Sequence, residues 1–285
     1  MGLLALVSHL NPHNGIITGV VHPSGGEPPA IGQVKCVEGR RSAHLTFLLP
    51  EDVHDSPALP ALLDGLAQEA GLWGKLGLLA EVDELHPVFE VLRRAGYSVY
   101  GWQRIYQIPF ENQAEGDDVP LWTFAESQDE IPIRQLYQSL VPPLVQAAEP
   151  LPAGRLYGLI YRENGAVLAY LESMYGPEGI YLRPLIHPNV DNVGALLRNL
   201  EGYLSPLLGR KVYLAVRSYQ SWLENPLMTM TPDSTARQAL MVKYLASRQR
   251  VALTNVHRAV IEDAGAEPSA PQMVKKARID GNRVK

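Results

Sequence analysis

Cysteine is nearly absent from this sequence of 285 residues, and Cys36 is the only one. A single cysteine excludes an internal disulfide and any zinc site built from several cysteines, and it is typical of a reducing compartment. Long apolar runs are also lacking, because no segment reaches the ~18 residues that a membrane-spanning helix needs. The apolar start, Met1–Ser8, is short and has no basic residue, unlike a secretory signal. We therefore expect a cytoplasmic protein with no membrane partner.

A surplus of positive charge is lacking as well, since the sequence has 25 Lys and Arg but 30 Asp and Glu, and the net charge is −5. Nucleic-acid binding usually rests on a basic field, so a nucleic-acid partner is not expected. Residues 241–285 depart from this balance, with nine Lys and Arg against four Asp and Glu. We interpret residues 251–285 as a helical and then basic tail. A solvated tail is favoured over one that docks on the acidic remainder or on a partner.

Two polar breaks divide the chain. Residues 111–118 (ENQAEGDD) have the composition of a linker, and residues 265–271 (GAEPSAP) separate the basic end. The hydrophobic fraction of 46% and the charged fraction of 19% are typical of globular domains. We therefore predict a first domain at residues 1–112 and a second at residues 119–250, followed by the tail.

The two predicted domains contain a similar order of elements. The first has strands at 16–21, 31–37, 43–50, 75–82 and 97–108, and helices at 57–70 and 87–95. The second has strands at 121–126, 156–161, 166–174, 180–188, 210–216 and 239–245, and helices at 131–145, 193–208 and 221–227. These assignments rest on apolar residues at helical spacing, on β-branched and aromatic runs, and on the Asn164-Gly165 turn. The repeated order indicates a duplicated α/β unit rather than one continuous sheet.

This order of strand, helix, hairpin, strand, helix, strand, helix and strand resembles that of the GNAT (Gcn5-related N-acetyltransferase) superfamily. The second domain resembles it from about residue 121 to 245, and the first, trimmed at its N-terminus, from about residue 16 to 108. Leu-Arg-Arg-Ala-Gly-Tyr at 92–97 is similar to the Y-x-x-x-G-F ending of the family's fourth helix, and the tails that begin at Gln103 and Gln238 look like the strand that follows. The resemblance implies two tandem acyl-CoA N-acyltransferase folds with mixed sheets.

The resemblance also implies acetyl-CoA as a substrate, bound where the third helix of the fold begins. GNAT enzymes carry an R/Q-x-x-G-x-G/A motif there, whose free backbone N–H groups and helix dipole hold the diphosphate. In the second domain Gly194 matches the first glycine, whereas Asp191 stands at the Arg/Gln position. In the first domain only Ala58 matches, behind Glu51-Asp52, whose charge repels a diphosphate. The residues expected to contact the cofactor are Ile186, Val193, Gly194 and Ala195.

GNAT catalysis requires a general base for the amine and a general acid for the CoA thiolate, usually a tyrosine of the fourth helix. The first domain has Leu92 at that position, so the resemblance assigns catalysis to the second domain. There Tyr219 is the candidate acid, and Glu172 and His187 are the candidate bases. The sequence thus predicts a CoA-dependent N-acyltransferase that acts on a small-molecule or peptide amine, without a metal. The alternative is a non-catalytic descendant with decayed CoA sites that binds a ligand or a protein.

Ordinary structural roles compete with several of these assignments. Asp191 or Asn192 is favoured as a cap of the helix that begins near Val193, rather than as a ligand. Glu172 also suits the solvated face of a strand, and His187 suits a loop. Tyr219 has a spacing to the following Trp and Leu that also fits plain packing.

Three further histidines and the lone cysteine offer weaker candidates. His9, His13 and His22 do not share a helix, because Pro12 and Gly15 interrupt it, so a metal site is not expected. Cys36 and His44 would be a nucleophile and its base on adjacent strands. No nucleophile motif surrounds Cys36, and a buried core role is favoured.

Overall fold

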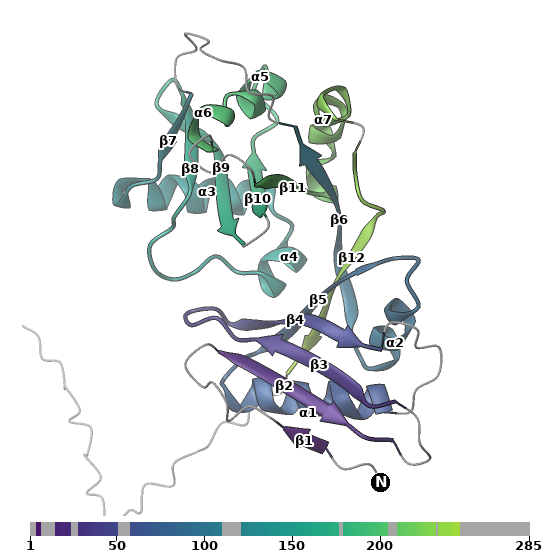
Figure 1. Ribbon diagram of the computed structural model, residues 1–285. Helices are drawn as coiled ribbons and strands as arrows, with labels where there is room; N and C mark the ends of the chain where they lie inside the picture. Colours follow the sequence, from purple (N-terminus) through teal and green to yellow (C-terminus); the bar gives the residue numbers. More distant parts are fainter. Residues whose placement is uncertain are drawn as a thin grey trace, which may run out of the picture. The chain divides into compact units, whose positions relative to one another are not determined.

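The computed structural model describes residues 4–6, 15–23, 28–50, 58–109, 121–176, 179–204, 210–231 and 233–245. All of them belong to one structural unit, residues 1–247 (Figure 1). The expected linker at 111–118, the break at 265–271 and the tail at 251–285 lie outside the described residues, as do His9 and His13. No helix in the described ranges combines the length and apolarity needed to cross a bilayer.

The first half, residues 4–109, follows the predicted order after one additional strand, at residues 4–6, that was not predicted. Its elements are β1 (Leu4–Leu6), β2 (Ile16–Val21), β3 (Ala30–Lys35), β4 (Ser42–Leu49), α1 (Ala58–Leu72), β5 (Gly77–Asp83), α2 (Val88–Arg94) and β6 (Ser98–Ile108). α1 forms where leucines recur every three to four residues, and Leu59, Leu62 and Leu66 on that stripe are fully buried. α2 ends before Gly96, whose φ of +86° suits glycine.

The second half, residues 121–245, is longer and has two more helices before its hairpin. Its elements are β7 (Trp122–Phe124), η3 (Ser127–Asp129), α3 (Glu130–Leu140), α4 (Pro143–Ala148), β8 (Leu159–Glu163), β9 (Ala166–Tyr175), β10 (Gly179–Ile186), α5 (Val193–Arg198), α6 (Glu201–Leu204), β11 (Lys211–Arg217), η5 (Ser218–Leu223), α7 (Glu224–Met230) and β12 (Gln238–Tyr244). The helix predicted at 131–145 is broken into α3 and α4. Val141 is extended there, because Pro142 and Pro143 follow it and a proline disfavours helical backbone in the residue before it.

The two halves share one sheet, which corrects the expectation of separate sheets. The sheet has twelve strands in the order β1-β2-β3-β4-β5-β12-β6-β11-β10-β9-β8-β7. The closing strand of the second half, β12, therefore lies between β5 and β6 of the first half, and β6 pairs with β11 of the second (Figure 1). Gln103 and Gln238, which the sequence placed at equivalent positions, face each other across the β6–β12 pair, and their side chains are hydrogen-bonded at 2.9 Å.

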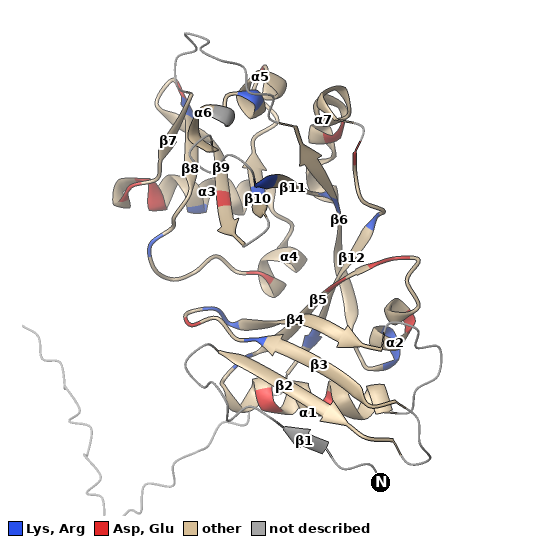
Figure 2. Ribbon diagram, in the orientation of Figure 1, with Lys and Arg blue, Asp and Glu red and all other residues tan. Residues whose placement is uncertain are grey.

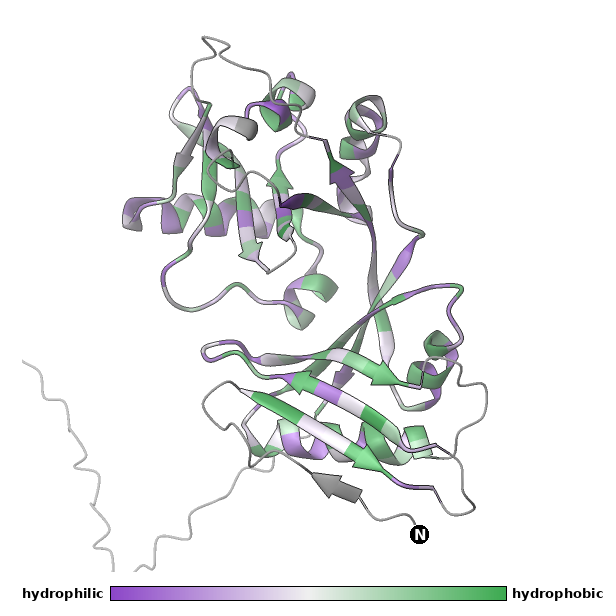
Figure 3. Cartoon of the chain, viewed as in Figure 1, coloured by the Kyte–Doolittle hydropathy of each residue, from purple (hydrophilic) through white to green (hydrophobic). Residues whose placement is uncertain are grey.

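The exchanged strand β12 joins the cores on both faces of the sheet. Ala239 and Met241 pack with α1 on one face, whereas Leu240 and Val242 pack with α3 and α4 on the other. Figure 3 shows green apolar positions along β12 and the neighbouring strands. The described residues of the first half include no helix before its hairpin, and α4 of the second half covers that face of β6 and β12. This arrangement places α3, α4 and the strands of both halves around one site.

Candidate functional site

The parallel strands of each half run together only at their start. β4 and β5 pair in register up to His44 and Leu79, and both strands then continue without pairing to each other. β10 and β11 pair up to Leu182 and Leu214 and then part in the same way. Beyond these points the inner edges of the strands lack their sheet partners, and their backbone groups need others. Each half thus has a gap between its two parallel strands.

Gln220 fills the gap of the second half. This residue of η5 is fully buried, with 0% of its surface exposed. Its Oε1 accepts a hydrogen bond from the Ile186 N–H at 2.9 Å, and its Nε2 donates one to the Pro184 carbonyl at 2.8 Å. A side chain of the protein therefore satisfies the inner edge of β10 beyond the parting point.

The gap of the first half differs in exposure. Beyond His44, the outer part of β4 is exposed at Thr46, and Phe47 and Leu49 are 39% and 41% exposed. The matching part of β10, residues 184–186, is buried. The outer part of β4 is therefore accessible in a way that the outer part of β10 is not.

Replacing Gln220 by alanine is expected to lower the free energy of unfolding by about 2–4 kcal/mol, because two buried backbone groups lose their partners and a void remains. Urea denaturation measures the change. Gln128→Ala is the matched control, since the Gln128 amide makes its hydrogen bond to Glu126 at the surface, and an effect within about 0.5 kcal/mol is expected. Equal effects of the two variants would contradict a structural role for Gln220 in the gap.

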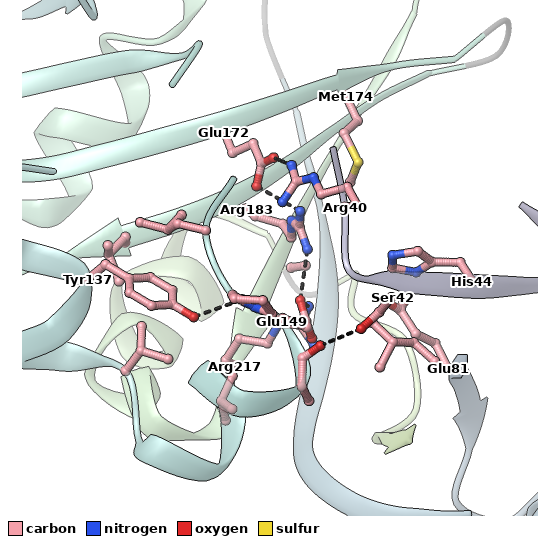
Figure 4. Close-up of a pocket in the computed structure, with 18 of the residues that line it drawn as sticks. Arg40, Ser42, His44, Glu81, Tyr137, Glu149, Glu172, Met174, Arg183 and Arg217 are labelled. Carbon is pink, nitrogen blue, oxygen red and sulfur yellow. Dashed lines mark hydrogen bonds and ion pairs between the residues drawn. The ribbon is translucent and has the colours of Figure 1, made fainter. Parts of the chain in front are cut away.

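A cavity of about 550 Å³ lies beside these gaps and is lined by both halves. Its polar lining comes from β3, β4, the turn between them and β5 in the first half, and from α3, the segment after α4, β9, β10, β11 and η5 in the second. Figure 4 shows these side chains converging on one space, and Figure 2 shows charged residues in the β3–β4 turn, which contributes Arg40 and Arg41 to the lining. Its titratable side chains include Arg40, His44, Glu81, Glu149, Glu172, Arg183, Arg217 and Tyr219.

Glu149 is the centre of a buried ion-pair network on the cavity wall. It follows α4, and its Oε2 lies 2.9 Å from Arg183 Nη1 and 3.2 Å from Arg217 Nη2. The Tyr100 hydroxyl of β6 donates to its other oxygen. Burial opposes ionisation of Glu149, but Arg217 and Arg183 outweigh it and hold the pKa of the carboxyl below its usual range. Glu149 therefore stays ionised and pairs two arginines from different strands.

Glu172 extends this network to the first half. Its Oε2 lies 2.7 Å from Arg183 Nη2 and its Oε1 lies 2.5 Å from Arg40 Nη2 (Figure 4). Arg40 sits in the β3–β4 turn, which the buried Lys75 holds by donating to the carbonyls of Val37 and Arg40 at 2.6 and 2.8 Å. Burial opposes ionisation of Glu172, but Arg183 and Arg40 lower the pKa of its carboxyl. A carboxylate held by two arginines is a weak base.

His44 is the titratable group at the parting point of β4 and β5. Its side chain is half-buried and faces the cavity, with Ser42 on the same face of the strand (Figure 4). Burial lowers the pKa of its imidazole, and Glu149 and Glu81 oppose that shift only in part. The imidazole is therefore neutral at pH 7 and able to accept a proton.

The residues that the sequence proposed for catalysis fall in two places. Glu172 and Tyr219 line the cavity, and burial raises the pKa of Tyr219 to about 12, so its hydroxyl keeps its proton at neutral pH. His187 does not line it. Its N–H bonds the Leu168 carbonyl and its Nδ1 accepts from the Asn189 N–H, as expected for a histidine in a turn.

The residues proposed for cofactor contact lie around the start of α5, a helix of six residues. The Ile186 N–H is bonded to Gln220, and the Ala195 N–H donates to the Asn192 side chain at 2.9 Å. The capping role predicted for Asn192 is therefore confirmed. Val193 and Gly194 form the first turn, where the nearest atoms to a side chain added at Gly194 belong to Arg198, Asn192 and Pro226. Two of the four expected amides thus already have partners within the protein.

Cys36 is a core residue, as predicted. It is buried in the cluster around α1, and burial raises the pKa of its thiol, which suppresses the nucleophilic thiolate. His44 instead faces the cavity on the other side, so the two do not form a catalytic pair. Within the described residues, no three His, Cys, Asp or Glu side chains gather in a way that would hold a metal ion.

Sequence reasoning missed Glu149, Arg183 and Arg217, and it set His44 aside. Arg183, for example, lies between Leu182 and Pro184 in the otherwise apolar stretch 182–186. A charged residue in a strand that is otherwise buried is a signal of a buried ion pair, although it does not identify the partner.

The sequence matches no family model, and no curated protein matches it significantly. Solved structures do resemble it. A GCN5-related N-acetyltransferase from Sphaerobacter thermophilus is 12% identical, with 80% of each chain covered and a TM-score of 0.50. A GCN5-related N-acetyltransferase from Kribbella flavida is 11% identical over 75% of this chain and 86% of that chain, with a TM-score of 0.47. A tandem GNAT protein from the clavulanic acid biosynthesis pathway is 16% identical over 80% and 82%, with a TM-score of 0.46.

The first of these likenesses, together with the order of elements in each half and the mixed sheet, agrees with the fold expected from the sequence. At 12% identity it speaks for the fold and not for a reaction. The chain therefore has the mixed α/β fold of the GNAT N-acetyltransferases, built from two halves in tandem.

Proposed function

We propose that this protein is a CoA-dependent N-acyltransferase whose amine acceptor binds in the cavity between the two halves. The observation that carries the proposal is the position of the cavity at the point where β4 and β5 part, with His44 at that point. An acyl thioester in the gap between β4 and β5 and an amine in the cavity would meet at this point. A cavity of about 550 Å³ suits a small molecule or the end of a peptide.

We assign the thioester to the gap of the first half. Gln220 already bonds the inner edge of β10 in the second half, whereas the outer part of β4 is exposed. This assignment differs from the one made from the sequence alone, which favoured the second half. Glu51-Asp52 follow Pro50 in the sequence and lie outside the described residues, and their charge is unfavourable to a diphosphate near the end of β4, so the affinity for acetyl-CoA should be modest.

The proposed chemistry is transfer of an acyl group from sulfur to nitrogen. The amine nitrogen attacks the thioester carbonyl carbon, the new C–N bond forms, and the C–S bond breaks. The neutral imidazole of His44 takes the proton that the nitrogen loses, and the departing thiolate takes a proton from the Tyr219 hydroxyl or from water. Glu149 and Glu172 are ion-paired and serve to hold Arg183 rather than to move protons.

Acetyl-CoA at ten times its Kd is expected to raise the Tm of the full chain by about 3–5 °C, because it binds the folded state alone. Removing the acidic charges in Glu51→Gln/Asp52→Asn should tighten binding about threefold to tenfold by relieving repulsion of the diphosphate. Thermal shift and calorimetry measure both effects.

Gly194→Glu locates the thioester. It places an acid at the start of α5, where an added Cβ makes only ordinary van der Waals contacts at 3.7–4.0 Å, so acetyl-CoA binding should be unchanged if the first half holds the thioester. The thioester would instead be assigned to the second half if Gly194→Glu abolishes the Tm shift by acetyl-CoA and Glu51→Gln/Asp52→Asn leaves the affinity unchanged.

A non-catalytic binding protein is the second candidate. Two observations favour it. The side chain of Gln220 occupies one gap, and the carboxylates on the cavity wall are ion-paired, which makes them weak bases. Under this candidate, neither millimolar acetyl-CoA nor a longer acyl-CoA shifts the Tm, and an amine is not acylated.

A further inference from the structure

Arg217 has a hydrogen-bond donor without a partner in the described part of the chain, buried in the wall of the cavity. It ends β11, and only 5% of its side chain is exposed. Its Nη2 is paired with Glu149, but its Nη1 is buried without a hydrogen-bond partner among the described residues. A buried cationic donor without an acceptor is costly, and such a group in a cavity indicates an acceptor brought by a ligand.

The charge of the lining favours an anionic acceptor. Five basic side chains line the cavity, namely Lys35, Arg40, Arg41, Arg183 and Arg217, against the three acids Glu81, Glu149 and Glu172. With His44 neutral, the wall keeps a net positive charge. Arg183 also has a buried nitrogen, Nε, without a partner among the described residues. A carboxylate is the group that a guanidinium binds best in such a place.

We propose that the ligand of this cavity is an amino carboxylic acid, with its carboxylate on Nη1 of Arg217 and its amine toward His44. The amine half of this assignment rests on the proposed acyl transfer, and the carboxylate half does not. Val141 and Val145 of the α3–α4 region, with Leu185 of β10, line another part of the cavity. An apolar or aromatic side chain on the ligand suits that wall.

Calorimetry on the full chain without CoA tests the proposal with three probes. Phenylalanine carries both groups, 3-phenylpropanoate carries only the carboxylate, and 2-phenylethylamine carries only the amine. Phenylalanine and 3-phenylpropanoate should bind, and 2-phenylethylamine should bind at least tenfold more weakly. Arg217→Gln should weaken both carboxylates about tenfold or more, the loss expected for one charge-assisted hydrogen bond.

Arg41→Gln is the matched control, because it removes the same charge from an exposed side chain of the lining. It should change the affinity for the carboxylates less than threefold. An equal loss of affinity in Arg41→Gln and Arg217→Gln would show that binding depends on the overall positive charge of the cavity and not on a contact with Arg217. That result would overturn the proposal. If Arg217→Gln does not fold, Arg217→Lys keeps the charge but loses the second nitrogen, and the same loss is expected.

The three probes decide the matter on the unaltered chain as well. The proposal is wrong if 2-phenylethylamine binds as tightly as phenylalanine, or if neither carboxylate binds at about 10 mM. Because CoA is absent, this failure is separate from that of acyl transfer. If the carboxylates bind but acetyl-CoA does not shift the Tm, the assignment of the carboxylate to Arg217 stands and the proposed transferase activity is rejected.

Discussion

Replacing Glu149 by glutamine is expected to lower the free energy of unfolding by about 3–5 kcal/mol, although the two side chains have nearly the same shape. Arg217 then loses the only ion pair that it makes within the described residues, and Arg183 keeps only Glu172. Arg217 stays buried and only 20% of the Arg183 side chain is exposed, so the variant leaves positive charge without its counter-charge. Urea denaturation at pH 7 measures the loss.

The Arg93–Glu90 pair supplies the control. The two residues lie one turn apart in α2, and both side chains are more than half exposed. Glu90→Gln should therefore change the free energy of unfolding by no more than about 0.5 kcal/mol. A loss for Glu149→Gln as small as that for Glu90→Gln would show that the buried network does not stabilise the fold.

Acid provides an independent check on Glu149. Its pKa is lower in the folded state than in the unfolded state, because Arg217 and Arg183 outweigh the effect of burial. The unfolded chain therefore binds more protons at mildly acidic pH, and the stability that Glu149 contributes is lost as pH falls through its folded pKa. The difference in stability between the wild type and Glu149→Gln should shrink as pH falls below the usual carboxyl range.

The elements of the fold could be predicted because their signals are local. The leucine stripe of α1, the aromatic and β-branched run of β6, and the turn at Asn164-Gly165 each lie within one segment. Asn164 and Gly165 both have positive φ, as the hairpin turn requires. The break between α3 and α4 also has a local signal, namely two consecutive prolines. It was not predicted because the apolar residues on both sides of the prolines have helical spacing.

The exchange of strands could not be predicted from the same kind of signal. β12 is apolar on both faces, with Ala239 and Met241 toward one core and Leu240 toward another, and this pattern fits any central position of a sheet. Its neighbours are chosen by packing between segments more than a hundred residues apart, as Gln238 opposite Gln103 shows. A sequence pattern fixes which residues face a core, but not which strand lies beside it.

The candidate site combines residues that only the fold brings together. Arg183 lies 34 residues from Glu149 in the chain, and Arg40 lies 132 residues from Glu172. Family resemblance pointed to Glu172 and Tyr219, which do line the cavity. It gave no sign of the first-half contribution, because the family's pattern is that of one domain and this cavity is built from two.

Replacing His44 by glutamine is expected to lower kcat for acyl transfer about 10²- to 10⁴-fold, the usual contribution of a general base, with little change in the Kd of acetyl-CoA. Burial lowers the pKa of the His44 imidazole below its usual 6.5. The wild-type rate should therefore hold from neutral pH down to that lowered pKa and fall as the imidazole gains a proton. The Gln variant should lack this acidic limb. Steady-state rates between about pH 5 and 8 measure both.

Glu172→Gln is the comparison that shows whether His44 or Glu172 is the general base. Glu172 lies in the same cavity, but Arg183 and Arg40 hold its carboxylate at 2.7 and 2.5 Å, so its basicity is low. Its loss should reduce kcat less than about tenfold, through the looser positions of the two arginines. If Glu172→Gln removes activity while His44→Gln keeps it, the base is Glu172.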